Sequence, residues 1–499
     1  MLSRLTSSMS GFNVSDFIKS PYGIGLLLVG LVVGTYMMLS KLKHGEREKF
    51  GILSFTFGLI IGVYWMLRPL KDSIFMSVVG GNYIYMAKWL SLAVVFPLVI
   101  LYSKLVDKFP RQKVFYALCT IYGLLALIFA AIIFHPTIGL SNTVLSVDRW
   151  WGWAWYVYVE SFGSLIVALF WAFVADTTTP ESGEKGYPVI AWGGQWGNVF
   201  GPMALSLIIA KFTQFEVGPE GELPAGAAQQ SSAVFGGMVI FAAFAMVCIM
   251  LLIKYFMKHV PKEQLVGYKA KDHAEKHTEP GFFEGLRLIV SSPYLLGIFG
   301  IITAYEVIVT VLDFNFKTLV SEAFPHVHAS GQYLADYGMW VGLISMISIM
   351  LRINKIQQML GLGASLALLP ILIACAVLMF KTYPFIAALF WIMVLSKAIN
   401  YALNQPSMKQ LYIPTTTDAK YKSQAFIEMY GSRGSKALGS AINSYRKVSL
   451  ALYGNAEGLA FFISVCTYSS LGIVALWLPI TLYLGRTYKK AVDEKRVVV

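Results

Sequence analysis

Runs of apolar residues, separated by short polar segments, follow one another along almost the whole chain. The first run lies at about residues 22–39, and twelve more follow it. Each is close to the roughly 20 residues that a helix needs to cross a bilayer core. The pattern therefore predicts an all-α polytopic membrane protein with twelve transmembrane helices and one extra N-terminal helix. The approximate limits of the twelve runs are 51–70, 84–106, 113–134, 150–175, 187–211, 232–257, 293–315, 335–352, 359–380, 384–403, 423–450 and 458–485.

The longest polar stretch, residues 254–292, separates the predicted spans into six and six. It divides the chain into an N-terminal segment with the extra helix (1–45), a first half (46–253), a cytoplasmic linker (254–292) and a second half with a basic tail (293–499). Two six-helix halves joined by a central cytoplasmic loop are the plan of the major-facilitator transporters. We therefore expect a major-facilitator-like fold.

Composition supports a membrane protein, and charge indicates its orientation. The chain is 57% hydrophobic and 13% charged, against about 25% charged in soluble domains. Its net charge of +13 comes from Lys and Arg dispersed near the ends of the spans, and the segments 72–83 and 212–231 contain neither residue. Because positive residues favour cytoplasmic loops, this alternation places the C-terminus in the cytoplasm. We expect the lipid bilayer as a partner, and no nucleic acid.

Small residues recur at every fourth position in the fifth and eleventh spans, which hold the same place in the two halves. Such a stripe lets a neighbouring helix approach closely. In this register Asn198 corresponds to Lys436, so we expect both at the same site. The stripes are Gly193, Gly197 and Gly201 in the fifth span, and Gly431, Ser435 and Gly439 in the eleventh.

Two pairs of basic residues lie within the predicted spans or at the end of one. Arg68 and Lys71 are three residues apart, as are Arg433 and Lys436, so each pair shares a helical face. A charge at mid-bilayer costs about 2.5–3.5 kcal/mol on insertion scales, so these cations need partners. Phosphate groups suit them, since Arg binds phosphate oxygens with two parallel hydrogen bonds. We therefore predict that these four residues, together with Asn198, bind an anionic substrate.

Acidic residues accompany these cations, and we expect Glu160, Glu306 and Asp313 to hold the cations when the site is empty. For Arg433 and Lys436 we expect Glu160 and Asp313 as the counter-ions. Glu160 stands alone within the fourth span, where it can pair with a cation, carry a coupling proton, or both. Glu306 and Asp313 lie two turns apart in the seventh span, and Asp313 can form an i, i+4 pair with Lys317. For the cluster at residues 68–72, an alternative is an outer-interface position at which the side chains reach water. We assign gating or coupling roles to Asp72, Glu160, Glu306, Asp313 and Lys317.

Nothing in the sequence indicates catalysis. It contains no Walker A loop, and its seven histidines show no metal-ligand spacing. The four cysteines lie in apolar runs without a CxxC pattern. We expect neither an enzyme nor a cofactor or metal site.

Several motifs resemble one known family in their order and spacing. The chain is similar to the ATP/ADP translocases of obligate intracellular bacteria and plastids over most of residues 46–490. The resemblance implies that the family's essential charged residues fall on Lys71, Glu160, Asp313 and Lys436. The matching stretches are LRPLKDS (67–73), YSKLVDKFPRQKVFY (102–116), YVESFGSLIVALFWAFVAD (158–176), LYIP (411–414) and KSQAFIEMYGSRGSK (422–436).

Other positions depart from that family. Glu306 stands where the family usually has a small residue, and Ala437 and Leu438 replace two glycines. Residues 403–409 (LNQPSMK) replace an FDATKE-like segment, and the extra N-terminal helix is not usual. These departures leave the substrate open among several nucleotides.

From the charges and the resemblance we expect nucleotide transport by alternating access, most simply the exchange of ATP for ADP or of other nucleoside tri- and diphosphates. The alternatives are proton-coupled import of a nucleotide or NAD, and a major-facilitator carrier of another phosphorylated anion. A membrane scaffold without transport is the alternative from another class. We expect a monomeric, multi-pass protein of the bacterial inner membrane.

Overall fold

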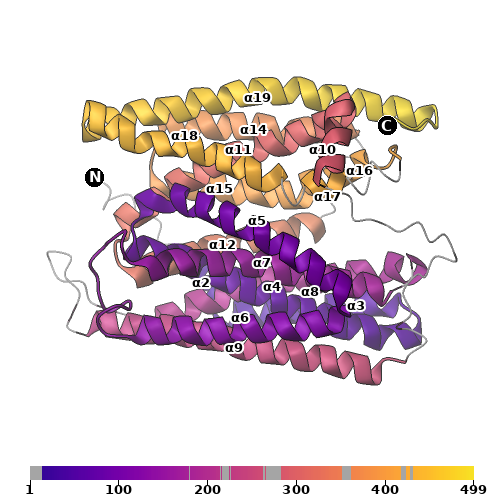
Figure 1. The fold of residues 1–499 in the computed structure, drawn as a ribbon, viewed down its shortest axis with the longest axis horizontal. Coiled ribbons are helices and arrows are strands. Elements are labelled where there is room, and N and C mark those ends of the chain that lie inside the picture. Colours follow the sequence, from indigo (N-terminus) through magenta and orange to yellow (C-terminus); the bar gives the residue numbers. More distant parts are fainter. Residues whose placement is uncertain are drawn as a thin grey trace.

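Long helices lie side by side in two groups, one from each half of the chain, as Figure 1 shows. The computed structural model describes residues 14–178, 180–213, 215, 224, 226–261, 265, 282–350, 361–416, 423–427 and 431–498. The first half supplies α4 (His44–Val78), η1 (Gly81–Tyr83), α5 (Ile84–Lys108), α6 (Arg111–Phe134), α7 (Trp150–Asp176), α8 (Pro180–Phe212) and α9 (Ala227–His259). The second half supplies α10 (Phe282–Ser291), α11 (Pro293–Ala323), α12 (Val327–Met350), α14 (Leu362–Thr382), α15 (Ile386–Ile399), the π-helix η3 (Asn400–Asn404), α16 (Gln405–Leu411), α17 (Gln424–Phe426), α18 (Ser432–Tyr453) and α19 (Asn455–Asp493).

The all-α membrane fold is confirmed. Among the described residues, nine helices have the length and apolar composition to cross a membrane, and the extra N-terminal helix is one of them. The predicted spans α8, α12, α15 and α18 are not among the nine and pack along them; α15 is apolar but shorter. Most of the predicted linker lies outside the described residues, although α9 continues to His259 and α10 occupies Phe282–Ser291.

The first predicted span is longer than its apolar run. Instead of ending near residue 70, α4 continues through Pro69 to Val78. Lys71 and Asp72 are therefore inside a helix, with 2% and 3% of their surface exposed. The alternative in which this cluster reaches water at the outer interface does not hold for these two residues. In the same way α11 continues past residue 315 to Ala323.

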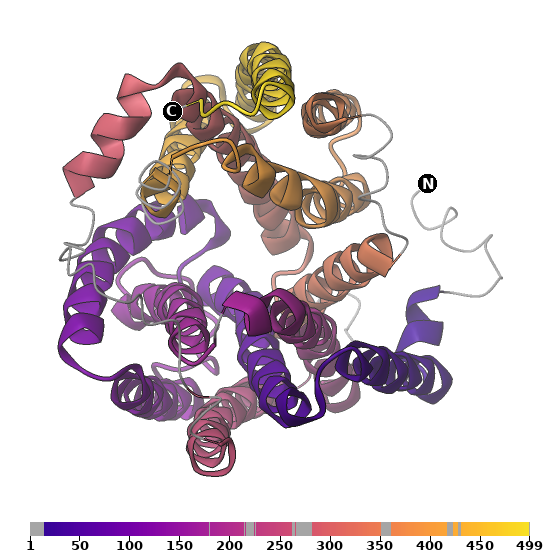
Figure 2. The same ribbon diagram turned by 90° about the vertical axis from the view of Figure 1, so that its right-hand side faces the viewer.

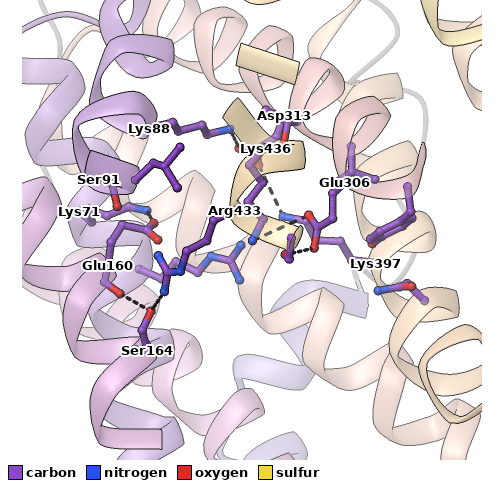
Figure 3. A pocket seen from close by; sticks show the side chains of 18 of the residues that line it. Lys71, Lys88, Ser91, Glu160, Ser164, Glu306, Asp313, Lys397, Arg433 and Lys436 are labelled. Carbon is purple, nitrogen blue, oxygen red and sulfur yellow. Dashed lines mark hydrogen bonds and ion pairs between the residues drawn. The ribbon is translucent and has the colours of Figure 1, made fainter. Parts of the chain in front are cut away.

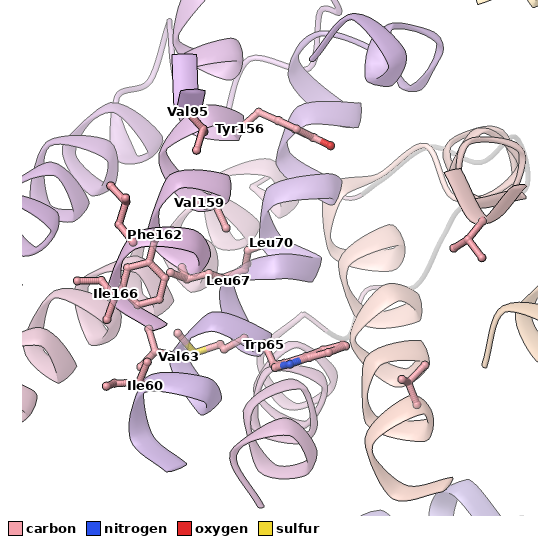
Figure 4. Close-up of a cluster of buried hydrophobic side chains, with 14 of the residues drawn as sticks. Ile60, Val63, Trp65, Leu67, Leu70, Val95, Tyr156, Val159, Phe162 and Ile166 are labelled. Carbon is pink, nitrogen blue, oxygen red and sulfur yellow. The ribbon is translucent and has the colours of Figure 1, made fainter. Parts of the chain in front are cut away.

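An apolar cluster fixes α7 against α4 (Figure 4). Ile60, Val63 and Leu67 on α4 lie close to Phe162 and Ile166 on α7, and all five are buried. Lipid tails are as apolar as these side chains, so close van der Waals packing rather than the hydrophobic effect holds the two helices together. The cluster therefore sets the distance between Lys71 on α4 and Glu160 on α7.

The small-residue stripes mark equivalent helix contacts in the two halves. A Cβ built on Gly197 of α8 would lie 2.2 Å from the carbonyl oxygen of Gly58 on α4. A Cβ on Gly439 of α18 would lie 2.7 Å from the carbonyl oxygen of Val307 on α11. Ser435 donates a hydrogen bond across the second contact, to Thr303 at 3.0 Å. The fifth predicted span thus packs on the first, and the eleventh packs on the seventh.

The N-terminal segment lies across the seam between the halves. It forms α2 (Val14–Lys19) and α3 (Pro21–Ser40), which stand at the edge of the bundle in Figure 2. Ser20 caps α3 by accepting a hydrogen bond from the Gly23 amide. Lys19 lies 2.5 Å from Asp336 of α12, which also accepts a hydrogen bond from Ser206 of α8. The added helices therefore contact both halves.

We predict that Gly197→Ala destabilises the protein by about 1–3 kcal/mol, because the added methyl group must push α8 away from α4. Gly237→Ala on α9 is the matched control, since a Cβ there meets nothing within 4 Å. Thermal unfolding of the two purified variants in detergent measures the difference. Equal melting temperatures would contradict the close contact of α4 and α8.

Candidate substrate-binding site

A cavity of about 290 Å³ lies between the two halves. Its walls come from α4, α5 and α7 of the first half, and from α11, α15, η3, α16 and α18 of the second. Most of the predicted site residues meet here. Arg68, Lys71, Glu160, Glu306, Asp313, Lys317, Arg433 and Lys436 all line it.

The cavity carries an excess of positive charge. Its described lining contains seven basic side chains and three carboxylates. We call it the cationic cavity. The basic side chains are Arg68, Lys71, Lys88, Lys317, Lys397, Arg433 and Lys436, and the carboxylates are those of Glu160, Glu306 and Asp313.

On the first half, the Lys71 ammonium is held from three sides. It donates a hydrogen bond to Glu160 of α7, lies 3.6 Å from Asp72, and stands 4.2 Å from the centre of the Tyr156 ring. Arg68, one turn earlier, stacks over Trp65 at 4.8 Å. Glu160 therefore pairs with a cation, which was one of the roles expected for it.

On the second half, Asp313 is surrounded by lysines from three helices. Lys317 lies 2.8 Å away, which confirms the predicted i, i+4 pair. Lys88 of α5 lies at 3.1 Å and Lys397 of α15 at 3.5 Å. A single carboxylate thus faces three ammonium groups, which accounts for much of the positive excess.

The two cations of α18 have different surroundings (Figure 3). Arg433 extends across the cavity and donates to the Ser164 hydroxyl on α7. Lys436 has 49% of its side chain exposed and lies 3.8 Å from Glu306. We expected Glu160 and Asp313 to be the counter-ions of this pair, but in the structure they bond lysines of other helices. Glu306 takes that place beside Lys436.

Polar contacts between the halves gather at one end of the bundle, where α4 ends and α5 begins; we call it the far end. Lys317 lies 2.9 Å from Asp72 across the interface. Arg446 of α18 also donates across the interface, to Asn82 in η1, and within its own half it lies 2.8 Å from Glu322 of α11. The cavity is thus closed on this side. The opposite end, on the right in Figure 1, carries the basic residues of the loops and the C-terminus, and we call it the basic end.

Not every predicted residue lines the cavity. Asn198 lies instead at the contact of α8 with α12, where its backbone carbonyl oxygen is 2.8 Å from a Cβ built on Gly342. Asp72 contacts the cavity indirectly, through Lys71 and Lys317. The sequence reasoning missed Lys88, although it is the one charged residue in the run 84–101 and so carried a signal.

A second cavity, of about 270 Å³, adjoins the first toward the basic end. Five residues line both cavities, so the two lie side by side. Together they reach the range of roughly 300–1,000 Å³ that small-molecule sites have. We call the second the amide cavity, since Asn400, Asn404 and Gln405 are in its wall. The shared residues are Tyr305, Glu306, Asn400, Gln405 and Ser432.

The fold is the major-facilitator-like membrane fold, with a charged cavity between its two halves. Solved structures of that architecture support this fold. A bacterial homologue of the iron transporter ferroportin, in its inward-facing state, aligns with a TM-score of 0.58 at 11% identity, over 88% of this chain and 100% of that one. The nucleoside transporter NupG aligns with a TM-score of 0.54 at 13% identity, over 88% and 99%.

Sequence comparison then gives the family. Residues 36–391 match the TLC ATP/ADP transporter family, and the chain belongs to it. "ADP,ATP carrier protein 3" of Rickettsia bellii is 24% identical over 84% of this chain and 90% of its own length. "ADP,ATP carrier protein 2, chloroplastic" of Arabidopsis thaliana is 22% identical over 83% and 70%. The family resemblance noted in the sequence is confirmed.

We predict that Arg446→Ala loosens the far end, because Arg446 donates from the second half to Asn82 of the first half. Losing this charge-assisted hydrogen bond of about 1.5–3 kcal/mol should raise opening roughly tenfold or more. The readout is the rate at which a membrane-impermeant thiol reagent labels Ser321→Cys, after the four native cysteines are replaced. Ser321 lies on α11 against Gly81 of η1, at the far end.

Lys447→Ala is the control for that experiment, since Lys447 is the next residue of α18 and is exposed. It should leave the labelling rate unchanged. A rate that Arg446→Ala does not raise would show that these contacts do not keep the far end closed.

Proposed function

We propose that the protein exchanges ATP for ADP across a membrane by alternating access. The observation that carries this is the excess of basic side chains in a cavity between two halves. Such a cavity suits a ligand with several negative charges, and a nucleotide is such a ligand. The names of the relatives in the same family agree with this substrate.

In this proposal the phosphates lie among Arg433, Lys436, Arg68 and Lys71. Arg433 and Arg68 suit two-pronged contacts with phosphate oxygens, whereas the lysines act as point charges. Because Lys71 already bonds Glu160, an arriving phosphate competes with that carboxylate. Binding therefore rearranges the Lys71–Glu160 contact between α4 and α7, and in this way substrate binding changes the packing of the first half.

The same charges account for exchange. Uncompensated charge is costly in the low dielectric of a membrane interior. When the cavity is empty, the ammonium groups around Asp313 outnumber the carboxylates, and the bridges at the far end hold the halves together. A bound nucleotide supplies the missing negative charge, so the loaded carrier changes sides faster than the empty one. Chemistry on the substrate is not needed, and the protein acts as a carrier rather than an enzyme.

We place the basic end in the cytoplasm, because Lys and Arg favour cytoplasmic loops. The C-terminus is then cytoplasmic, and the structure corresponds to a carrier closed to the outside. We further propose a bacterial inner membrane as its location and a monomer as its working unit, since one chain supplies the whole cavity.

Counter-transport in liposomes tests this function. We predict that purified protein takes up labelled ATP only into vesicles loaded with ADP or ATP, because an empty carrier returns slowly. Empty vesicles with a pH gradient are the comparison. Uptake driven by that gradient without internal nucleotide would indicate proton symport and refute exchange.

We also predict that Arg433→Ala and Lys436→Ala each weaken nucleotide binding by roughly tenfold to a hundredfold, which is the loss of one or two charge-assisted hydrogen bonds. Lys381→Ala is the matched control, since this exposed lysine of α14 bonds Tyr468 at 2.8 Å, away from the cavity. Equal affinities in all three variants would exclude α18 from the phosphate site.

A further inference from the structure

The amide cavity differs in chemistry from the cationic cavity beside it. Its wall contains side-chain amides, the Glu306 carboxylate, one exposed lysine (Lys409), and apolar groups such as Ile302, Met408 and Ile427. Amides and a carboxylate bind N–H and O–H groups, whereas apolar groups pack against the face of a ring. This combination suits an uncharged, flat, hydrogen-bonding group better than a phosphate.

Glu306 marks the boundary between the two regions. One carboxylate oxygen accepts a hydrogen bond from Ser432 at 2.9 Å, and the other lies 3.8 Å from Lys436. A carboxylate repels phosphate, so Glu306 is an unfavourable neighbour for phosphate oxygens beyond Lys436. An ionised carboxylate accepts hydrogen bonds and donates none, so a ligand in contact with Glu306 must present donors.

The backbone of the amide cavity is also unusual. Residues Asn400–Asn404 form a π-helix between α15 and α16, and π-helical turns are rare and often mark functional sites. Asn404 donates a hydrogen bond to the Asn400 side chain at 2.8 Å. The amide oxygen of Asn404 has no hydrogen-bond partner among the described residues, although only 4% of the residue is exposed. A buried polar atom without a partner calls for an explanation, such as an ordered water or an ion.

We propose that the amide cavity binds the nucleoside part of the substrate, with the base donating its exocyclic amino group to Glu306. This inference rests on the proposed function, because it takes the phosphates to lie on the basic residues of the cationic cavity. It makes the carrier selective for bases with an amino group, as in adenine, guanine or cytosine, over uracil. Glu306 is then a residue that determines specificity.

The substitution Glu306→Gln tests this with little change of shape. It replaces one acceptor oxygen with an N–H₂ donor, which suits the carbonyl oxygen of uracil and opposes the amino group of adenine. The measurement is competition by ATP, UTP and inorganic tripolyphosphate for labelled ATP bound to the purified full-length protein. Tripolyphosphate has no nucleoside, so it reports the phosphate site alone.

We expect the wild type to prefer ATP to UTP, and Glu306→Gln to reduce that preference about tenfold, in the range of one lost base contact. Any change in affinity for tripolyphosphate applies to both nucleotides and cancels in their ratio. Glu457→Gln, the same change on an exposed residue of α19, should leave the ratio as it is.

A second variant tests whether the nucleoside contacts the amide cavity without changing Glu306, which also lies beside Lys436 of the phosphate site. Gln405 is exposed and lines both cavities, so Gln405→Ala is compatible with folding. It should weaken ATP binding several-fold and leave tripolyphosphate binding unchanged.

The outcomes separate the two proposals. An ATP to UTP ratio that Glu306→Gln leaves unchanged, or Gln405→Ala weakening tripolyphosphate as much as ATP, would overturn the nucleoside site alone. A wild type that binds tripolyphosphate but no nucleotide would overturn the proposed function as well.

Discussion

The structure depends on keeping several positive charges inside a membrane without leaving them unpaired. A continuous set of ion pairs does this, running from Glu160 through Lys71, Asp72 and Lys317 to Asp313. It starts on α7, passes through α4 and ends on α11, so it ties the two halves together. The helices around it must stay close enough for these contacts, because an isolated charge there costs about 2.5–3.5 kcal/mol.

That requirement explains where the small residues are. The stripe at Gly193, Gly197 and Gly201 brings α8 against α4, whose far side carries the charges, and Gly439 does the same for α18 on α11. The two contacts are equivalent in the two halves. Of the two helices that carry the stripes, however, α18 has cations that line the cavity and α8 has none among the described lining residues. Asn198 holds the position that corresponds to Lys436, and it lies at the contact with α12 instead. The repeat therefore governs helix packing, while the charges have diverged.

The sequence predicted those features that a single helix determines. Apolar length gave the long helices, and a spacing of three or four residues gave the shared faces and the Asp313–Lys317 pair. It did not predict the partners that come from other helices, because those depend on how the helices cross. For this reason Lys436 was assigned the wrong counter-ions, and Lys88 was overlooked. The extension of α4 past residue 70 was missed because paired charges let a helix continue where the apolar run has ended.

In the proposed binding mode, the nucleoside contacts the second half, whereas the phosphates contact both halves. The described residues that line the amide cavity all belong to the second half: they lie on α11, η3, α16 and α18, with Tyr412 directly after α16 and Ile427 directly after α17. The cationic cavity takes Arg68, Lys71 and Lys88 from the first half and the remaining cations from the second. When the halves rock against each other, the nucleoside keeps its contacts, while the phosphates gain or lose those of α4 and α5. The phosphate charge, rather than the base, is then the part of the substrate that changes the relative stability of the two orientations. Selectivity for the base and the driving force for exchange are therefore separable in this protein, because they reside on different sides of the interface.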